Sequence, residues 1–436
     1  MMYGIDVSPA VLDTLMLWTI GGVLVASIIS LVPGLHIYNF AGLIILATSY
    51  YDIISSESLV FLFLGMISGY AILNIIPGVF LSVPDESTVF VILPAQKYLM
   101  QRRGYEAVVL SGLGGLGGLL TLVLVSPFAT RVLPALRAIL GPHFGWILWA
   151  IIFYMALSEW PKGTGRAAAG WQRWWEGWKN LVAGITTFVF SGILGMILMS
   201  RMIIPISRAY QNLTPAFIGL FAVPWVIQNL LAGVSIPPQN RARSVDAPLN
   251  ALLHGTFAGV LGGLFAAFFP VITGGIGALL AGHATAQRDD RVFIISQGAS
   301  KVVYYVGSLL LFFVPGLHMT RGGMAWMLST RISSYSLQVY YLATAAALFA
   351  GVLAFFLSLG FARVACRWIH RINYHIISWF TFGILILVVV GFTGIRGLLV
   401  CAVATAIGLI PVLWGARRMN AMGILLLPIA FNMMGW

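Results

Sequence analysis

The sequence predicts an all-α polytopic membrane protein with two inverted structural repeats whose helices are broken or re-entrant. Of 436 residues, 60% are hydrophobic and only 8% are charged, and the mean hydropathy is +0.97. A soluble globular chain carries roughly 25% charged residues, so this chain lacks the polar surface needed to face water on all sides. A second observation, a pair of Pro-Gly interruptions that recurs in both halves, predicts the repeats.

Long apolar blocks recur from end to end and predict about 10–12 transmembrane spans in the cell membrane, because crossing takes about 20 apolar residues. We expect spans near 11–32, 57–76, 106–127, 143–159, 181–200, 214–234, 248–269, 300–314, 336–360, 376–392, 395–413 and 420–435.

Four shorter apolar pieces, at 38–50, 77–96, 271–284 and 317–330, are interrupted by Pro and Gly. They are too short to span and too apolar for ordinary loops. Such segments enter a membrane partway where protein or a wet cavity satisfies their backbone groups. We therefore expect re-entrant half-helices there.

The loop at 161–180 carries four tryptophans, which concentrate at membrane interfaces. It predicts a helix on the bilayer surface over 168–179, with docking of a partner as the alternative. The expected organisation is a first repeat half, an interfacial linker loop with a connecting span, a second repeat half and C-terminal transmembrane helices, at 1–160, 161–213, 214–360 and 361–436.

The internal repeat is read from Pro-Gly pairs and their spacing. PGLH at 33–36 is followed 44 residues later by Pro77-Gly78. In the second half, Pro270 and the sequence TGG at 273–275 precede a second PGLH, at 315–318, which begins 45 residues after Pro270. Pro lacks an N–H and Gly adopts conformations other residues avoid, so both interrupt helices. Interruptions at matching positions in two halves indicate the binding site of a secondary transporter.

Broken helices direct helix N-termini into the membrane interior, where unpaired N–H groups and a partial positive charge attract anions. Lys301 and Arg321 are candidates for the substrate's negative charge, with snorkelling to the interface as the alternative. For His36 and His318 the alternative is helix capping or packing. The predicted substrate-binding residues are Pro33, Gly34, His36, Asn39, Pro77, Gly78, Thr273, Gly274, Gly275, Lys301, Pro315, Gly316, His318 and Arg321.

Asp85 and Glu86 follow Pro84 in a re-entrant-looking stretch and are joined by Ser87. Ionisable groups at membrane depth are costly, so they mark functional sites. These residues are the candidates for a coupling ion, Na⁺ or H⁺. The alternative is a loop apex at the aqueous edge.

Other function classes find little support in the sequence. It has no HExxH, GxSxG or P-loop motif and no His/Cys spacing for a metal, so we expect no enzyme, cofactor or metal site. The net charge of +12 is spread over short loops, where we expect it to set topology and contact anionic lipid rather than nucleic acid, with attraction of an anionic substrate as the alternative. The glycines at 112–118 and 255–263 are typical of close helix packing.

The two-half layout resembles the large membrane subunit of the tripartite tricarboxylate transporters. VPGL at 32–35 and NIIPG at 74–78 resemble the first-half pair of helix breaks, and 269–278 with VPG at 314–316 resemble the second. The resemblance implies an inverted-repeat transporter for organic acids driven by a sodium or proton gradient. It also implies a small membrane subunit and an extracytoplasmic solute-binding protein as partners. The acidic pair after Pro84 departs from the family pattern, so the chain resembles a divergent member.

The favoured function is a secondary active permease, a symporter moving a small organic anion such as a carboxylate. Its site is expected at the bilayer midplane between the repeats. One alternative is a translocase of a lipid-linked phosphate such as polyprenyl phosphate, and another is a non-transporting membrane scaffold. The sequence does not define the oligomeric state, and a homodimer is compatible with it.

Overall fold

The computed structural model describes residues 8–32, 35–51, 54–82, 87, 90–161, 170–201, 203–204, 212–232, 235–241, 244–287, 289–317, 319–332 and 336–435. Across these residues the regular structure is entirely helical. Nine helical stretches among them are long and apolar enough to cross a membrane. The all-α, multi-pass membrane fold predicted from composition is therefore confirmed.

Two of these nine stretches are long enough for two crossings each, since a bilayer core of roughly 30 Å is spanned by about 20 helical residues. Gly104–Leu157 covers 54 residues. Tyr374–Trp414 covers 41 residues and is interrupted at Gly394, where φ is 71° and ψ is −165°. The residues on either side of Gly394 correspond to the spans predicted at 376–392 and 395–413.

The helices form two compact units, and each is described by itself. The first unit comprises residues 1–83, 90–138 and 235–373. Its helices are α1 (Pro9–Ile29), α2 (Ile37–Tyr51), α3 (Ser56–Leu73), α4 (Ile75–Phe80), α5 (Ile92–Met100), most of α6 (Gly104–Leu140), α11 (Leu249–Phe268), α12 (Gly274–Ala284), α13 (Asp290–Phe313), α14 (Gly323–Ser329) and α15 (Leu337–Trp368).

The same order of elements occurs twice in the first unit. A spanning helix, a break, a half-length helix and a second spanning helix follow one another as α1, α2 and α3, and again as α11, α12 and α13. Short helices then lead to a long one: α4 and α5 precede α6, and α14 precedes α15. This repeated order supports two structural repeats, and their inversion stays a prediction.

Glycine lets the spanning helices of each half approach closely. A Cβ added at Gly22 in α1 would clash with the Leu62 carbonyl of α3, and one at Gly259 in α11 would clash with the Ser296 carbonyl of α13. The prediction that the glycine-rich stretches serve helix packing is confirmed.

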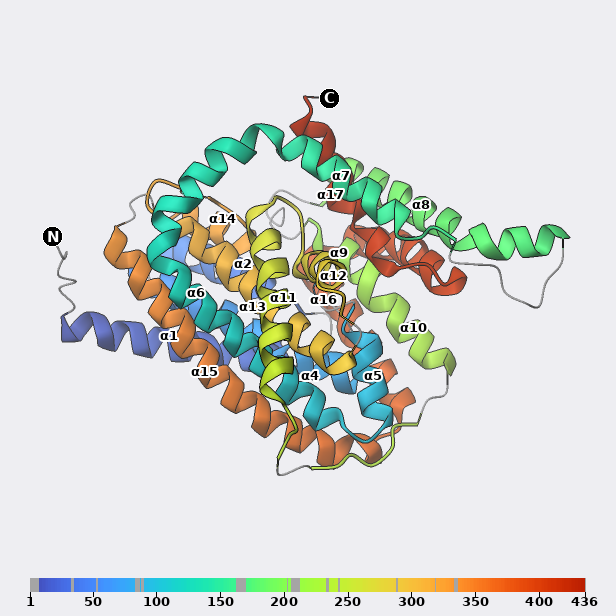
Figure 1. Cartoon of the computed structure of the whole chain (residues 1–436), viewed down its shortest axis with the longest axis horizontal. Helices are drawn as coiled ribbons and strands as arrows, with labels where there is room; N and C mark the ends of the chain where they lie inside the picture. The colour runs from blue at the N-terminus through green and yellow to red at the C-terminus, as the bar shows by residue number, and fades with distance from the viewer. Residues whose placement is uncertain are drawn as a thin grey trace. The chain divides into compact units, whose positions relative to one another are not determined.

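The last helix of each half packs on the other half. α15 contacts α1 and α3, and Figure 1 shows it crossing α1. From the first half, α6 lies against α13, where a Cβ at Gly114 would clash with the Ile295 carbonyl. α3 and α13 consequently form the interior of this unit, and the apolar segment of α13 is completely buried.

α13 begins ten residues earlier than the span predicted at 300–314. Its first turns carry Ser296, Gln297, Ser300 and Lys301, all buried, which lower the local hydropathy. Polar residues that face protein rather than lipid concealed the true length of this span.

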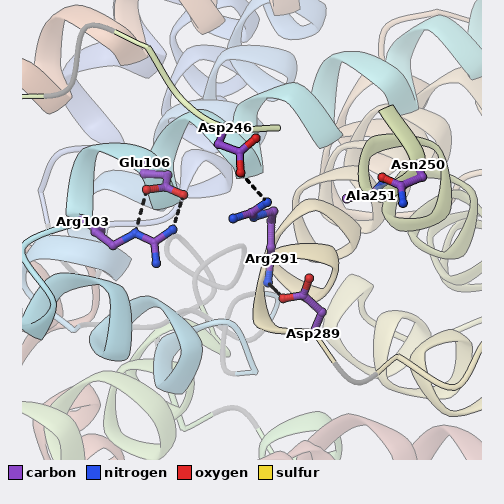
Figure 2. A network of polar contacts seen from close by, with 7 residues as sticks. All are labelled: Arg103, Glu106, Asp246, Asn250, Ala251, Asp289 and Arg291. Atoms are coloured by element: carbon purple, nitrogen blue, oxygen red, sulfur yellow. Dashed lines mark hydrogen bonds and ion pairs between the residues drawn. The ribbon is translucent and has the colours of Figure 1, made fainter. Parts of the chain in front are cut away.

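Charged side chains join the turns at one end of the first unit. Arg103 donates two hydrogen bonds to Glu106 at the start of α6, and Arg291 of α13 pairs with Asp246 at 3.0 Å (Figure 2). Asp289 caps α13 by accepting from the Arg291 backbone N–H at 2.9 Å. Lys97 at the end of α5 pairs with Asp290.

The second unit comprises residues 84–89, 139–234 and 374–436. Its helices are η1 (Gly141–His143), α7 (Phe144–Leu157), α8 (Gly170–Ser200), α9 (Thr214–Phe217), η3 (Ile218–Ala222), α10 (Val223–Ala232), α16 (Tyr374–Trp414), η5 (Arg418–Met422) and α17 (Gly423–Met433). Buried Glu159 ties this unit together by accepting from the Arg417 backbone N–H at 2.7 Å and the Asn420 amide at 3.0 Å.

The tryptophan segment does not form a separate helix. α8 runs without interruption over Gly170–Ser200, so Trp171, Trp174, Trp175 and Trp178 occupy the first turns of a spanning helix. Trp174 stacks on Trp171 with ring centroids 4.7 Å apart, and Trp178 packs against Trp160 at 5.2 Å. Tryptophan clusters of this kind are typical of membrane interfaces, and the interfacial position stays a prediction, while the segment continues directly into the span.

Candidate functional site

The first break lies between the end of α1 at Ile29 and the start of α2 at Ile37. His36 immediately precedes α2, and its Nδ1 accepts a hydrogen bond from the Tyr38 backbone N–H at 3.2 Å. Asn39 returns the contact, since its Oδ1 accepts from the His36 backbone N–H at 3.2 Å. This reciprocal arrangement is a capping box with histidine in the place usually held by Ser or Thr.

The second break follows α11, which ends at Phe268. Val271 adopts a φ of 65°, a conformation that β-branched residues rarely take. Thr273 then precedes α12 without a side-chain hydrogen bond that caps the helix. Arg321 supports the turn by donating from one nitrogen, at 2.9 Å each, to the carbonyl oxygens of Ala266 and Ile272.

A single stretch of α13, residues 300–305, contacts both breaks. The Tyr305 hydroxyl lies 3.1 Å from Nε2 of His36 at the first break. The Ser300 hydroxyl donates to the Gly274 carbonyl at 2.9 Å at the second. A Cβ added to Gly274 would lie 3.2 Å from Cβ of Tyr304 and 3.4 Å from Cα of Lys301. The two breaks, predicted only from their spacing, therefore meet the same helix.

Lys301 carries its ammonium group into this region and is only 3% exposed. Its Nζ donates to Oδ1 of Asn74 at 2.7 Å and lies 5.5 Å from the ring centroid of Tyr70. The His36 ring packs against the same tyrosine, with centroids 5.0 Å apart. A buried cation surrounded by phenol and amide groups can bind an anionic ligand, because charge–charge attraction is strong where water is excluded.

Arg321 is partly buried, and its guanidinium donates two hydrogen bonds to backbone carbonyls. The Ala266 carbonyl belongs to the last turn of α11, which has no intrahelical partner. Arg321 thus stabilises the second break, and a direct contact with substrate stays a prediction.

The second Pro-Gly pair of each half differs from expectation. We expected a break at Pro77-Gly78, but both residues are buried inside α4, and the chain turns three residues earlier, at Asn74. Pro77 lies in the first turn of this short helix, where a missing N–H costs no hydrogen bond. In the second half Pro315 and Gly316 do follow α13, with φ of 78° at Gly316, but α14 begins only after Gly322.

Several predicted residues lie outside the described part of the chain, namely Pro33, Gly34, Asp85, Glu86 and His318. Of the predicted coupling-ion residues the structure describes Ser87, which is buried and belongs to the second unit. Thr273 and Gly275 are buried beside Gly274 at the start of α12.

Sequence reasoning missed Tyr70 and Tyr305, which surround His36 and Lys301. Tyr304 and Tyr305 lie three and four residues after Lys301, so helical geometry places them next to it. That spacing from Lys301 could have identified Tyr304 and Tyr305 from the sequence. No feature of the sequence around Tyr70 indicated that it lies near Lys301.

Comparison with known proteins identifies the family of the chain. Residues 16–423 match the profile of the tripartite tricarboxylate transporter TctA family. The chain belongs to this family. An uncharacterized protein of Methanocaldococcus jannaschii is 26% identical over 422 residues, covering 95% of this chain and 97% of that protein. No solved structure matches the chain.

Membership in the TctA family identifies the chain as the membrane component of a tricarboxylate transporter system, and this confirms the resemblance seen in the Pro-Gly pattern. The family is one of transporter components rather than enzymes. Its members typically work with a small membrane subunit and a solute-binding protein.

Proposed function

We propose that this member of the TctA family is a secondary active transporter for a small organic anion, with its binding site at residues 300–305 of α13. The observation that carries the proposal is the meeting of both helix breaks on this one stretch. Paired breaks around a common site are the arrangement expected of a transporter with internal repeats. Lys301 supplies a fixed positive charge at that site.

The site contains groups suited to a carboxylate. The Lys301 ammonium is buried, the Tyr305 hydroxyl can donate or accept, and the N-terminus of α12 adjoins Lys301 through Gly274. Helix N-termini favour carboxylates and phosphates, since their first N–H groups lack intrahelical partners. We propose that this site lies at the bilayer midplane; the burial of α13 along its length supports a position inside the protein, away from lipid.

The first test is thermal stabilisation of the purified protein in nanodiscs by citrate, succinate, inorganic phosphate and a polyprenyl phosphate. A ligand that binds the native state raises the apparent midpoint by mass action. We expect a carboxylate to stabilise the protein and to be taken up by proteoliposomes. Stabilisation by polyprenyl phosphate alone would instead favour a lipid-phosphate translocase, and no stabilisation by any compound would favour a scaffold.

Lys301→Met tests the site itself. Removing a buried charge that binds an anionic ligand costs on the order of 2 kcal/mol, so we expect affinity to fall about 30-fold. Lys97→Met is the matched control, because Lys97 is exposed and pairs with Asp290. Carboxylate binding that is equal in Lys301→Met and the wild type would refute this position for the site.

A further inference from the structure

Two adjacent arginines of the second unit have no acidic partner. Arg417 and Arg418 follow the end of α16, and neither forms an ion pair within the described part of the chain. Nη1 of each guanidinium is buried and has no acceptor among the described residues. A charged nitrogen that is shielded from water costs free energy unless an acceptor binds it. The two guanidinium groups therefore favour a bound anion.

The carboxylate of Glu159 does not neutralise these arginines. Its Oε1 accepts from the Arg417 backbone N–H at 2.7 Å, which joins the turn after α16 to the end of α7. The Arg418 guanidinium lies over the Trp225 ring, with Cζ 3.4 Å from the centroid, and donates one hydrogen bond to Gln228. Both arginines are only half-buried, so part of each stays accessible to a ligand.

Tryptophans from three segments gather around the first turns of α8, in the same unit. Trp160, which follows α7, packs against Trp178 of α8 with ring centroids 5.2 Å apart. Trp414, the last residue of α16, packs against Trp175 at 5.9 Å, and Trp174 stacks against Trp178 at 6.0 Å. Apart from Trp178, these side chains are 38% to 54% exposed. Exposed indoles at the ends of spanning helices are typical of the headgroup level of a bilayer.

We infer that Arg417, Arg418 and these tryptophans form a binding site for the headgroup phosphate of an anionic phospholipid. Guanidinium groups bind phosphate oxygens through strong, charge-assisted hydrogen bonds. The segments 161–180 and 415–422 carry six basic residues and one acidic residue, so they also attract an anionic membrane surface. The site belongs to the second unit, whereas the proposed transport site on α13 belongs to the first.

Thermal denaturation of the detergent-purified protein tests the site with dioctanoyl phosphatidylglycerol, dioctanoyl phosphatidylcholine and inorganic phosphate. A ligand that binds the native state raises the apparent midpoint by mass action. We expect phosphatidylglycerol to raise the midpoint more than the same concentration of either other compound. The zwitterionic lipid lacks the net negative charge, and inorganic phosphate lacks the glycerol and acyl groups that contact the indoles. An equal shift with phosphatidylcholine or with inorganic phosphate would overturn the assignment to an anionic lipid.

Arg417→Gln is the decisive variant, because it removes the guanidinium and keeps the backbone N–H that binds Glu159. Losing a hydrogen bond to a charged group should lower the affinity for phosphatidylglycerol about tenfold. Arg418→Gln is a second variant with a loss expected in the same direction. Arg396→Gln is the matched control, since Arg396 is an exposed arginine of α16 and its removal changes the net charge equally.

The variants separate a defined site from a general effect of charge. Wild-type affinity for phosphatidylglycerol in both Arg417→Gln and Arg418→Gln would overturn the proposal. An equal loss in Arg396→Gln would also overturn it, because binding would then follow net charge alone. A loss in Arg417→Gln and Arg418→Gln, with affinity kept in Arg396→Gln, is the result expected of a site at the end of α16.

Discussion

The two helix breaks of the first unit have the same place in the order of elements but are held by different chemistry. At the first, the His36 side chain caps the N-terminus of α2 and Asn39 completes the capping box. At the second, α12 begins at Thr273 without a side-chain cap, and the guanidinium of Arg321 binds the carbonyls before it.

This difference gives the two breaks different kinds of support. The first is held by side chains next to it in the sequence, His36 and Asn39, which bind backbone N–H groups at the start of α2. The second is held by a guanidinium about 50 residues away, and hydrogen bonds from a charged donor stabilise more than those between neutral groups. Repeated architecture supplies two equivalent positions, and the side chains that hold them differ.

The largest effect is expected where the two halves are most alike, at their glycine contacts. Gly22→Ala and Gly259→Ala each place a methyl group against a carbonyl of the neighbouring span. Overpacking of this kind costs about 3 kcal/mol, so both variants should lose many degrees of thermal stability in nanodiscs.

Gly360→Ala in α15 is the matched control, since a Cβ there meets nothing within 4 Å. It should be neutral or stabilising, because Ala favours a helix over Gly by up to about 1 kcal/mol. If only one of Gly22→Ala and Gly259→Ala destabilises, the two halves are not packed equivalently.

A smaller loss of stability is expected from substitutions at the breaks, and it should differ between the two. Arg321→Met leaves the Ala266 and Ile272 carbonyls without their charged donor, which should cost about 2 kcal/mol. Asn39→Ala removes the hydrogen bond that its side chain accepts from the His36 backbone N–H in the cap, and should cost about 1 kcal/mol. Thermal denaturation of both variants measures the difference, and equal losses would contradict the view that the second break depends on a fixed cation.

Much of this architecture could be predicted from the sequence because its signals are local. The half-helices expected at 38–50 and 271–284 are α2 (Ile37–Tyr51) and α12 (Gly274–Ala284). Pro and Gly act on the backbone where they stand, so the ends of these helices follow from the residues themselves. The same rule failed at Pro77-Gly78, where the first turn of a helix accommodates a proline.

The partners within the site were beyond local reasoning. His36 and Tyr305 are 269 residues apart, and Lys301 and Asn74 are 227 residues apart. The packing of α3 against α13 brings Asn74, at the end of α3, to Lys301. The buried polar residues of α13 also lower its hydropathy, and for this reason the predicted span began ten residues too late.

The smallest expected effect concerns the helices that follow the second Pro-Gly pair of each half. Lys97 at the end of α5 pairs with Asp290, and both are well exposed, at 60% and 37%. Arg331, just after α14, donates to the Thr48 carbonyl of α2 instead. Exposed ion pairs contribute little and are screened by salt, so Lys97→Met should change the thermal midpoint by no more than about 1 °C.

The hydrogen bond from Lys97 to Asp290, together with the charge of Asp290, raises the pKa of Lys97. The small contribution of this pair is therefore present below the ordinary lysine pKa and is lost only as pH rises through the raised value. Arg331→Met should cost more, about 2 °C, since a carbonyl loses its charged donor. The comparison is made at low salt and at about 1 M salt, where any effect of Lys97→Met should vanish. A Lys97→Met loss that exceeds the Arg331→Met loss and persists at high salt would show that the ion pair, and not the hydrogen bond, is the stronger tie between the halves.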